Sequence, residues 1–480
     1  MMEMMLTPRR QNRSGVDILN QKKFHMPTAY TILFLLLILV AAATWIIPAG
    51  SYDYVDGVPV AGTYHTVEQN PQGVGDVLKA AFSGFYDAVD VCIFILMVGG
   101  FLGVVMKTGA VDAGVGNVIR LLGGREKWLI PILMLLFGLG GTTYGMWEET
   151  MAFYPLLIPV FLAAGYDAVV GISVILLGAG AGVIASTVNP FATGIAAGFA
   201  GVSLGEGIVL RLLEWVAFEA AAIWFVMAYA AKVKKNPSKS VVGVGAGKIQ
   251  VSMDQQVSFT AKRKVIMALF TLTFLIMVYA VVPFEEMGLS LPALGWWFPE
   301  LSALFLVAGV VIGLIDRMSE EELVETYVAG CADLLGVAFI IGISRGITVL
   351  MNDGAITDTV LHWGEQALSG AGAISFTLLV FALYLPLTIL IPSSSGLATL
   401  SIPIVAPLGK FAGVGGDLVV TAFQSASGLV NIITPTAAVV MGALALGHVP
   451  YDRWVKYVWK LILWFLLLAL AFLVAGVLLG

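Results

Sequence analysis

Charged side chains are scarce in this sequence. Asp, Glu, Lys and Arg make up 12% of its 480 residues, against roughly 25% in ordinary soluble domains. Hydrophobic residues make up 59%, and the mean hydropathy is +0.94. With so few charges to face water, the chain is expected to be a polytopic membrane protein. The 54 glycines fit this expectation, because small residues let membrane helices approach closely.

The residues that build disulfides and metal sites are also rare. There are two cysteines, Cys92 and Cys331, both in apolar stretches, and four histidines without ligand spacing. Neither a disulfide framework nor a metal enzyme is indicated. No basic stripe with interleaved aromatic residues is present, so no nucleic-acid partner is expected. The segment VVGVGAGK (241–248) has the glycines of a phosphate loop, but Ile249 follows Lys248 and no apolar strand precedes it, so we interpret it as a tether.

Two adjacent carboxylates, Glu148 and Glu149, interrupt the otherwise apolar stretch GTTYGMWEETMAFYPLLIP (141–159). Each ionisable side chain at the centre of a membrane helix costs roughly 2.5–3.5 kcal/mol on insertion scales. Glycines precede the pair and prolines follow it, which indicates non-helical backbone lining a polar cavity. We therefore interpret residues 128–164 as a re-entrant hairpin with its tip at Gly145–Thr150. The alternative is a short loop at the membrane surface with solvated glutamates.

The order of apolar and charged segments predicts the topology. Residues 1–27 are basic and are expected in the cytoplasm. Residues 51–73 are polar, with a turn at Asp56-Gly57, and are expected outside. We expect spans at about 30–48, 80–106, 208–231, 265–283 and 298–315, and an amphipathic interfacial helix at 111–122. The predicted divisions are 28–231 (first repeat), 232–264 (basic cytoplasmic linker), 265–295 (connecting span and outer loop) and 296–480 (second repeat).

The second half repeats the first. MKTGAVDA (106–113) matches MNDGAITD (351–358), and NPFATGIAAG (189–198) matches TPTAAVVMGA (434–443). GEGIVLRLLEW (205–215) matches GHVPYDRWVKYVW (447–459), which aligns Arg211 with Arg453. The second copy begins with a span running outward at about 328–352, whereas the first begins with one running inward. The sequence therefore predicts an inverted repeat of nine crossings and two hairpins, with the C-terminus outside; the alternative is chance resemblance between apolar segments.

Each half contains a hairpin tip and a broken helix. The breaks are STVNP (186–190) and NIITPT (431–436), and the second tip lies in IPSSSGLAT (391–399). Inverted repeats place substrate at the midplane, where such half-helices meet. The small polar residues could otherwise serve only as contacts between helices, worth about 0.6 kcal/mol each. We expect substrate to contact Glu148, Glu149, Thr150, Asn189, Ser393, Ser394, Ser395, Gly396, Asn431 and Thr434, and an ion to contact Gly145, Ser186, Thr187, Ser427 and Thr436.

The two tips differ in charge. A serine tip with free backbone N–H groups suits a carboxylate, whereas a glutamate pair suits an ammonium, a guanidinium or a coupling cation. A zwitterionic or basic amino acid would satisfy both tips. Among the other charges, Asp87 and Asp90 are interpreted as helix N-terminal caps. Arg345 either binds a substrate carboxylate or pairs with an acid such as Asp333.

The motifs GMWEET, ASTVNPFATG, IPSSSGLATLSIPI and GLVNIITPT resemble those of the YfcC-type branch of the dicarboxylate carrier families (DcuC-like), in the ion transporter superfamily. The resemblance covers nearly the whole chain from residue 25. It implies a dimer in which a mobile transport domain slides past a static scaffold. Relatives carry Ser-Asn-Thr at both tips; here these positions read Glu-Glu-Thr (148–150) and Ser-Ser-Gly (394–396). Some branches of the superfamily exchange arginine and ornithine, and the glutamate tip favours such a substrate.

The sequence thus predicts an all-α polytopic protein with an inverted-repeat, elevator-type transporter fold. We expect a secondary transporter in the cytoplasmic membrane, a homodimer rather than an enzyme, whose cargo is a basic amino acid. The first alternative is a four-carbon dicarboxylate carried with Na⁺ as coupling ion, and no other cofactor is expected. The alternatives of another class are a channel and an intramembrane enzyme, the latter expected to carry an aspartyl pair.

Overall fold

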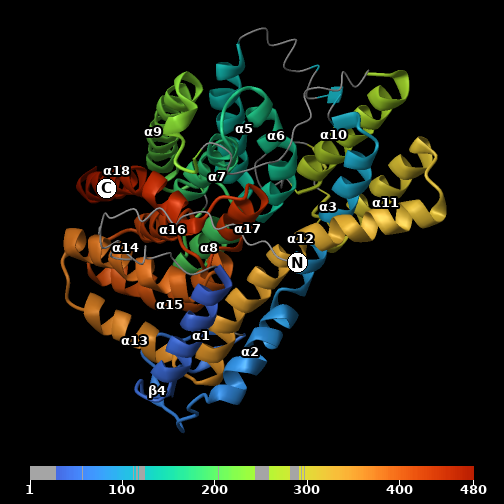
Figure 1. Ribbon diagram of the computed structural model, residues 1–480. Helices are drawn as coiled ribbons and strands as arrows, with labels where there is room; N and C mark the ends of the chain where they lie inside the picture. The colour runs from blue at the N-terminus through green and yellow to red at the C-terminus, as the bar shows by residue number, and fades with distance from the viewer. Residues whose placement is uncertain are drawn as a thin grey trace, which may run out of the picture.

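The computed structural model describes residues 29–56, 58–111, 113–114, 117, 125–203, 205–243, 259–281, 291–292, 294–296 and 298–479. In this part of the chain the fold is almost entirely helical (Figure 1). The strands are two residues long: β1 (Gly50–Ser51) pairs with β4 (His65–Thr66), and β2 (Tyr54–Val55) with β3 (Val58–Pro59). The all-α expectation is confirmed.

Contacts between elements divide most helices into two sets. In the first, α12 packs along α1, α2 and α3, and α11 packs on α3 and α10. We call it the α12 set. It lies along one side of the molecule in Figure 1, where α12 runs as a long diagonal. Its helices are α1 (Ala29–Ala43), α2 (Val74–Asp87), α3 (Val89–Lys107), α10 (Ala261–Val281), α11 (Phe298–Asp316) and α12 (Glu320–Asp353).

The second set, which we call the hairpin set, is centred on α7 and α16, which touch each other and contain the most deeply buried residues. Its first-half helices are α5 (Leu129–Tyr144), α6 (Tyr154–Ala163), α7 (Ala168–Ile184), α8 (Ile195–Ala200) and α9 (Ile208–Lys235). Its second-half helices are α14 (Ala373–Leu390), α15 (Ser394–Phe411), α16 (Gly416–Asn431), α17 (Ala438–Leu446) and α18 (Tyr451–Leu479).

Both halves of the hairpin set make the same pairings. Helix α7 packs on α5, α6 and α9, and α16 packs on α14, α15 and α18. Each central helix then breaks. The first break is followed by a π-helical turn, η3 (Pro190–Gly194), and the second by residues 432–437 before α17 begins. The predicted breaks at Asn189 and Thr434 are confirmed. The opposite insertion of the two halves stays a prediction.

Glycines and caps explain how these apolar helices pack and begin. A Cβ on Gly99 would lie 2.5 Å from the Gly330 carbonyl oxygen, so α3 and α12 approach as closely as their backbones allow. The carboxylate of Asp167 accepts a hydrogen bond from Val170 N (3.0 Å) and begins α7. Ser319 begins α12 in the same way, accepting from Glu322 N at 3.1 Å.

Five of the described helices are long and apolar enough to cross a membrane, namely α3, α11, α12, α14 and α18. The segments predicted as spans at 208–231 and 265–283 are helical, as α9 and α10. The predicted single span at 80–106 is instead two helices, α2 and α3, which meet at Ala88. The count of nine crossings, the domain boundaries and the side of each terminus stay predictions.

Several predictions concern segments outside the described residues. They are the basic tail (1–27), most of the amphipathic segment (111–122), Gly57 of the predicted turn, the middle of the linker (244–258) with Lys248, and the acidic part of the outer loop with Glu285 and Glu286. Beside Gly57, Asp56 has φ of 50°, a conformation typical of a tight hairpin turn.

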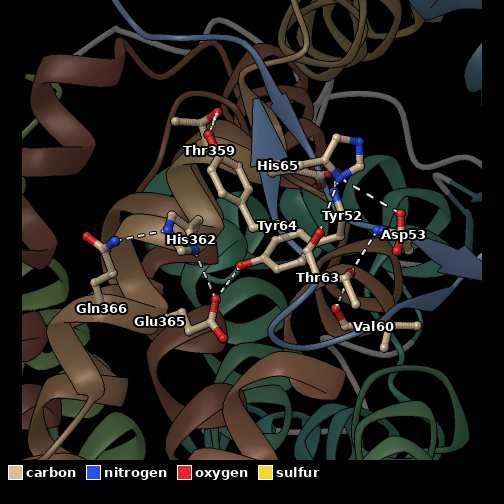
Figure 2. A network of polar contacts seen from close by, with 11 residues as sticks. Tyr52, Asp53, Val60, Thr63, Tyr64, His65, Thr359, His362, Glu365 and Gln366 are labelled. Atoms are coloured by element: carbon tan, nitrogen blue, oxygen red, sulfur yellow. Dashed lines mark hydrogen bonds and ion pairs between the residues drawn. The ribbon is translucent and has the colours of Figure 1, made fainter. Parts of the chain in front are cut away.

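A small polar cap joins the segment after α1 to α13 (Thr357–Leu368) (Figure 2). The Tyr52 hydroxyl donates to Glu365 Oε2 at 2.7 Å. His362 Nδ1 lies 3.0 Å from the same oxygen, and the His362 ring stacks on Tyr64 with centroids 4.0 Å apart. Burial, followed by the hydrogen bond to Glu365, raises the pKa of Tyr52, so its hydroxyl remains a donor. The cap fixes the polar segment 51–66 onto the second half of the chain.

Candidate functional site

A cavity of about 150 Å³ lies where the α12 set meets the hairpin set. The α12 set contributes residues of α3, α11 and α12, and the hairpin set contributes both tips and both breaks. The lining includes nine of the fifteen predicted site residues: Gly145, Glu148, Glu149, Asn189, Ser393, Ser394, Ser395, Asn431 and Thr436. It also includes Val91, Phe298, Ile341, Ser344 and Arg345 from the α12 set.

The acidic tip turns at Gly145. This residue ends α5 with φ 77° and ψ 31°, a left-handed conformation that favours glycine. A Cβ here would also lie 2.5 Å from Asn189 Nδ2, so the turn and the first helix break fit together only because residue 145 has no side chain. The chain then forms a 3-10 helix, η2 (Glu148–Phe153), before α6. The predicted turn at the glutamate pair is confirmed.

The two glutamates are not in bulk water. Glu149 is 7% exposed, and its Oε2 accepts a hydrogen bond from Trp147 N at 3.1 Å. Glu148 is half-buried and lines the same cavity. The alternative interpretation, a short surface loop with solvated glutamates, is therefore wrong. Thr150 is fully buried and does not line the cavity; its hydroxyl donates to Trp147 O at 2.5 Å.

The serine tip is the start of a helix. Ser393 is the N-cap of α15, and its Oγ accepts a hydrogen bond from Gly396 N at 3.2 Å. Gly396 thus contributes to the cap rather than to the lining. Ser394 and Ser395 lie in the first turn and line the cavity. The N-terminal end of α15 carries about half a positive charge, so this side of the cavity favours an anionic group.

The breaks contribute fewer groups than the sequence predicts. Asn189, Asn431 and Thr436 line the cavity. Thr187 lies behind it, donating to Thr142 O at 3.0 Å, and Thr434 Oγ1 lies 2.9 Å from Thr436 Oγ1.

Two further predicted ion ligands, Ser186 and Ser427, also lie outside the lining. Both are buried, and neither hydroxyl oxygen has a hydrogen-bond partner among the described residues. Across the part of the chain that the structure describes, no three His, Cys, Asp or Glu side chains are grouped to hold a metal ion.

Arg345 brings a positive charge to the cavity. Its Nε lies 3.8 Å from Asp87 Oδ2, and its charge acts on Glu148. The suggested pairing with Asp333 is therefore replaced by one with Asp87. The cap interpretation of Asp87 is wrong, because the residue ends α2 instead of beginning a helix. Asp90 lies in the first turn of α3, whose N-cap residue makes no side-chain hydrogen bond.

Sequence reasoning missed the apolar and linking residues of the α12 set. Ser344 donates to Thr436 O at 2.6 Å and so joins α12 to the second break. Val91, Phe298 and Ile341 close the cavity on that side. Only Arg345 gave a signal in the sequence, as a lone charge in the apolar run IIGISRGITVL. The others are ordinary membrane-helix residues, and tertiary packing alone brings them to the site.

Apolar helices assembled around a small charged cavity define a membrane transporter. The chain belongs to the DcuC family of C4-dicarboxylate anaerobic carriers, whose profile matches residues 26–478. The resemblance to the YfcC-type branch is confirmed by a relative at 30% identity.

Two curated relatives span nearly the whole chain. An uncharacterized protein of Haemophilus influenzae is 35% identical, over 95% of this chain and 98% of its own length. YfcC of Escherichia coli (strain K12), named provisionally as a basic amino acid antiporter, is 30% identical over 91% of this chain and 93% of its own.

Two solved structures align with most of this chain. The Alcanivorax borkumensis YdaH transporter aligns with a TM-score of 0.42 and 15% identity, covering 92% of this chain and 98% of its own. MtrF of Neisseria gonorrhoeae, from a class of antimetabolite efflux pumps, aligns with a TM-score of 0.42 and 18% identity, covering 93% and 94%.

Proposed function

We propose that this transporter exchanges or takes up a basic amino acid, with the cavity between the two helix sets as its binding site. The observation that carries the proposal is the charge pattern of that cavity. Glu148 and Glu149 lie on one hairpin tip, while Arg345 and the N-terminal end of α15 supply positive charge. A dipolar molecule with a carboxylate and a cationic side chain matches both signs.

The negative side accounts for the cationic end of the substrate. Glu149 is oriented by its hydrogen bond to Trp147 N, and Glu148 lines the cavity half-buried. Two carboxylates on adjacent residues suit a guanidinium, which presents donors in a planar fork. A dicarboxylate would meet the same pair with like charge.

The positive side accounts for the carboxylate. Arg345 reaches the cavity from α12, and its contact to Asp87, at 3.8 Å, is longer than a hydrogen bond. The N–H groups at the start of α15 point along the helix axis, as anion sites at helix N-termini require. Together, Arg345 and the N-terminal end of α15 bind the carboxylate of the amino acid.

The position of the cavity supports an elevator mechanism. Its walls come from both helix sets, so sliding the hairpin set along the α12 set would carry the two tips and the two breaks together. In this proposal the α12 set is the scaffold, which forms the homodimer, and the N-terminus lies on the cytoplasmic side of the inner membrane and the C-terminus outside.

A Na⁺-coupled dicarboxylate transporter is the second candidate. Arg345 and the serine tip favour a dicarboxylate, and the family description names C4-dicarboxylates as the cargo. A dicarboxylate would leave Glu148 and Glu149 without a cationic partner on the substrate. Na⁺ would then have to neutralise them.

Uptake into proteoliposomes separates these candidates. Radiolabelled arginine and succinate are supplied with and without an inward Na⁺ gradient, and vesicles are preloaded with ornithine or left empty. We expect saturable arginine uptake that is accelerated by preloaded ornithine and does not require Na⁺. Succinate uptake driven by Na⁺, with no arginine uptake, would overturn the proposal, and so would unsaturable flux, which indicates a channel.

A further inference from the structure

A carboxylate outside the cavity is buried without a hydrogen-bonding partner. Glu219 on α9 is 2% exposed, and neither of its carboxyl oxygens accepts a hydrogen bond from a described residue. Its neighbour Glu214 differs, because its Oε1 accepts from Ser425 Oγ at 2.8 Å. Buried polar groups in native proteins nearly always have partners, so Glu219 requires an explanation.

The Glu219 carboxyl lies against the backbone of the acidic hairpin. A Cβ on Gly138 of α5 would lie 2.4 Å from Glu219 Oε2 and 3.3 Å from Trp215 Nε1. Because residue 138 has no side chain, the Glu219 carboxyl can occupy this space. Gly138 precedes Gly145, where the tip turns, by seven residues, or about 10 Å of helix.

No described residue of the helices packed on α9 forms an ion pair with Glu219, and Lys239, the basic residue of the short helix η4 (Pro237–Lys239), is exposed beyond the end of α9. Helices α5 and α7 carry no charged residue. The charged residues of α18 end at Lys460, before Phe465, which contacts Phe218. On α9 itself, Arg211 lies two turns away, where the charges of Asp417 and Glu214 act on it, and the lysines are in the last turn.

These surroundings favour a proton over a metal ion. An ionised carboxylate buried without a counter-ion costs several kcal/mol, and a proton removes that charge. The indole nitrogen of Trp215, which lies near Gly138 together with the carboxyl, is only a donor and cannot ligate a cation, and the described residues hold no group of three His, Cys, Asp or Glu side chains that could bind a metal ion. We propose that Glu219 is a proton-binding site through which transport responds to protons, its carboxylate taking a proton from water and returning it there.

A second cavity lies on the same pair of helices as Glu219. About 390 Å³ of space lies between α5 and α9, lined by Ile130 and Met227 and bordered by Lys127, Lys234 and Lys235. Ile130 precedes Gly138 by eight residues, and Met227 follows Glu219 by eight. The cavity and the carboxyl thus lie on the same seam between two helices, about 12 Å apart along each.

The site has two states that differ at the hairpin. With the proton bound, Glu219 is neutral and rests on Gly138. Without it, the charge requires a donor, and the indole N–H of Trp215, which also has no hydrogen-bond partner among the described residues, is the donor we assign to it. The Glu219 carboxyl and the Trp215 indole both lie beside Gly138 of α5. Loss of the proton therefore acts directly on the helix that leads to the Glu148 tip. Only this coupling step depends on the proposed function.

Infrared difference spectroscopy between about pH 6 and pH 10, a range in which ordinary glutamates with a pKa of about 4.3 stay ionised, tests the site in the purified full-length protein, without transport. We expect the carbonyl band of a protonated carboxylic acid in the wild type, one such group fewer in Glu219→Gln, and an unchanged spectrum in Glu325→Gln, whose side chain is exposed. Identical bands in wild type and Glu219→Gln would overturn the proposal.

A second measurement tests the coupling. Wild-type arginine uptake should change with pH by up to about tenfold per pH unit, the slope of one titrating group, whereas Glu219→Gln should change less than about twofold. Superimposable pH profiles would overturn the coupling. If neither protein transports arginine but the infrared band is lost in Glu219→Gln, the proposed cargo is wrong and the proton site stands.

Discussion

The two hairpin tips occupy the same place in their halves and differ in chemistry. The first turns at a left-handed glycine and continues as a 3-10 helix that presents Glu148 and Glu149. The second begins an α-helix at once, with Ser393 as its cap. One tip supplies carboxylates and the other a helix N-terminus. A duplicated scaffold with two different tips can bind a molecule whose two ends differ in charge.

The last helices of the halves show the same divergence. In the alignment that pairs Arg211 with Arg453, Glu219 pairs with Leu461. Leu461 is as buried as Glu219, at 2% exposure. The position requires a buried side chain in both halves, but only the first half has a carboxyl there. The carboxyls of the first tip and of position 219 thus have no acidic counterpart in the second half.

The largest change in stability is expected for a substitution in the first half at a point where two helices contact each other through their backbones. A Cβ on Gly182 of α7 would lie 2.2 Å from the Gly138 carbonyl oxygen. The corresponding pair in the second half, α14 and α16, is instead joined by an edge-to-face contact between Tyr384 and Phe423, whose ring centroids are 4.9 Å apart. Gly182→Ala should lower the free energy of unfolding by about 3 kcal/mol, measured by thermal denaturation in detergent.

The matched control is Gly198→Ala, since nothing lies within 4 Å of its added methyl group. That variant should be neutral or more stable by roughly 0.5–1 kcal/mol. Equal stability of the two variants would mean that the close approach of α5 and α7 is not required.

The acidic tip is tested by Glu149→Gln. Removing one partner of a buried charge pair costs about 2–5 kcal/mol, so arginine affinity should fall about 100-fold, or roughly 2.7 kcal/mol. Glu148→Gln should have a smaller effect, because Glu148 is more exposed. Isothermal titration gives both values. Unchanged affinity in the two variants would remove the tip from the binding site.

The positive side is tested by Arg345→Gln. Arginine affinity should fall about 30-fold, or roughly 2 kcal/mol, because the substrate carboxylate loses a charged partner. Agmatine, which lacks that carboxylate, should bind both proteins equally. Arg125→Gln is the control, since Arg125 is exposed and lies outside the cavity. A parallel loss of agmatine affinity would assign Arg345 a structural role instead.

The polar cap joins the two halves of the chain outside the cavity lining, and a substitution in it should give the smallest effect. Tyr52→Phe removes the hydrogen bond to Glu365 and should cost about 1 kcal/mol of stability with no change in transport. Because burial raises the pKa of Tyr52, this loss should persist at mildly alkaline pH. Tyr86→Phe, at an 83% exposed site, should change nothing; an equal change would mean that the cap contributes no stability.

Much of the helical order follows from the sequence. Glycines, prolines and runs of small polar residues together predict both tips and both breaks, because these residues favour the ends of helices, although Pro386, Pro403 and Pro407 lie inside helices. The side chains that converge are harder to predict. Thr150 and Thr187 form hydrogen bonds with backbone away from the cavity, while Arg345, Ser344 and Phe298 reach it from helices of the other set. Packing between distant helices decides both outcomes.

The most direct test of the two-tip site is a comparison of arginine, agmatine and succinate binding to three proteins: the wild type, Glu149→Gln and Arg345→Gln. The account predicts that arginine binds the wild type most tightly, that Glu149→Gln weakens arginine and agmatine together, and that Arg345→Gln weakens arginine alone. Tightest binding of succinate to the wild type, with Glu149→Gln strengthening it, would contradict the account.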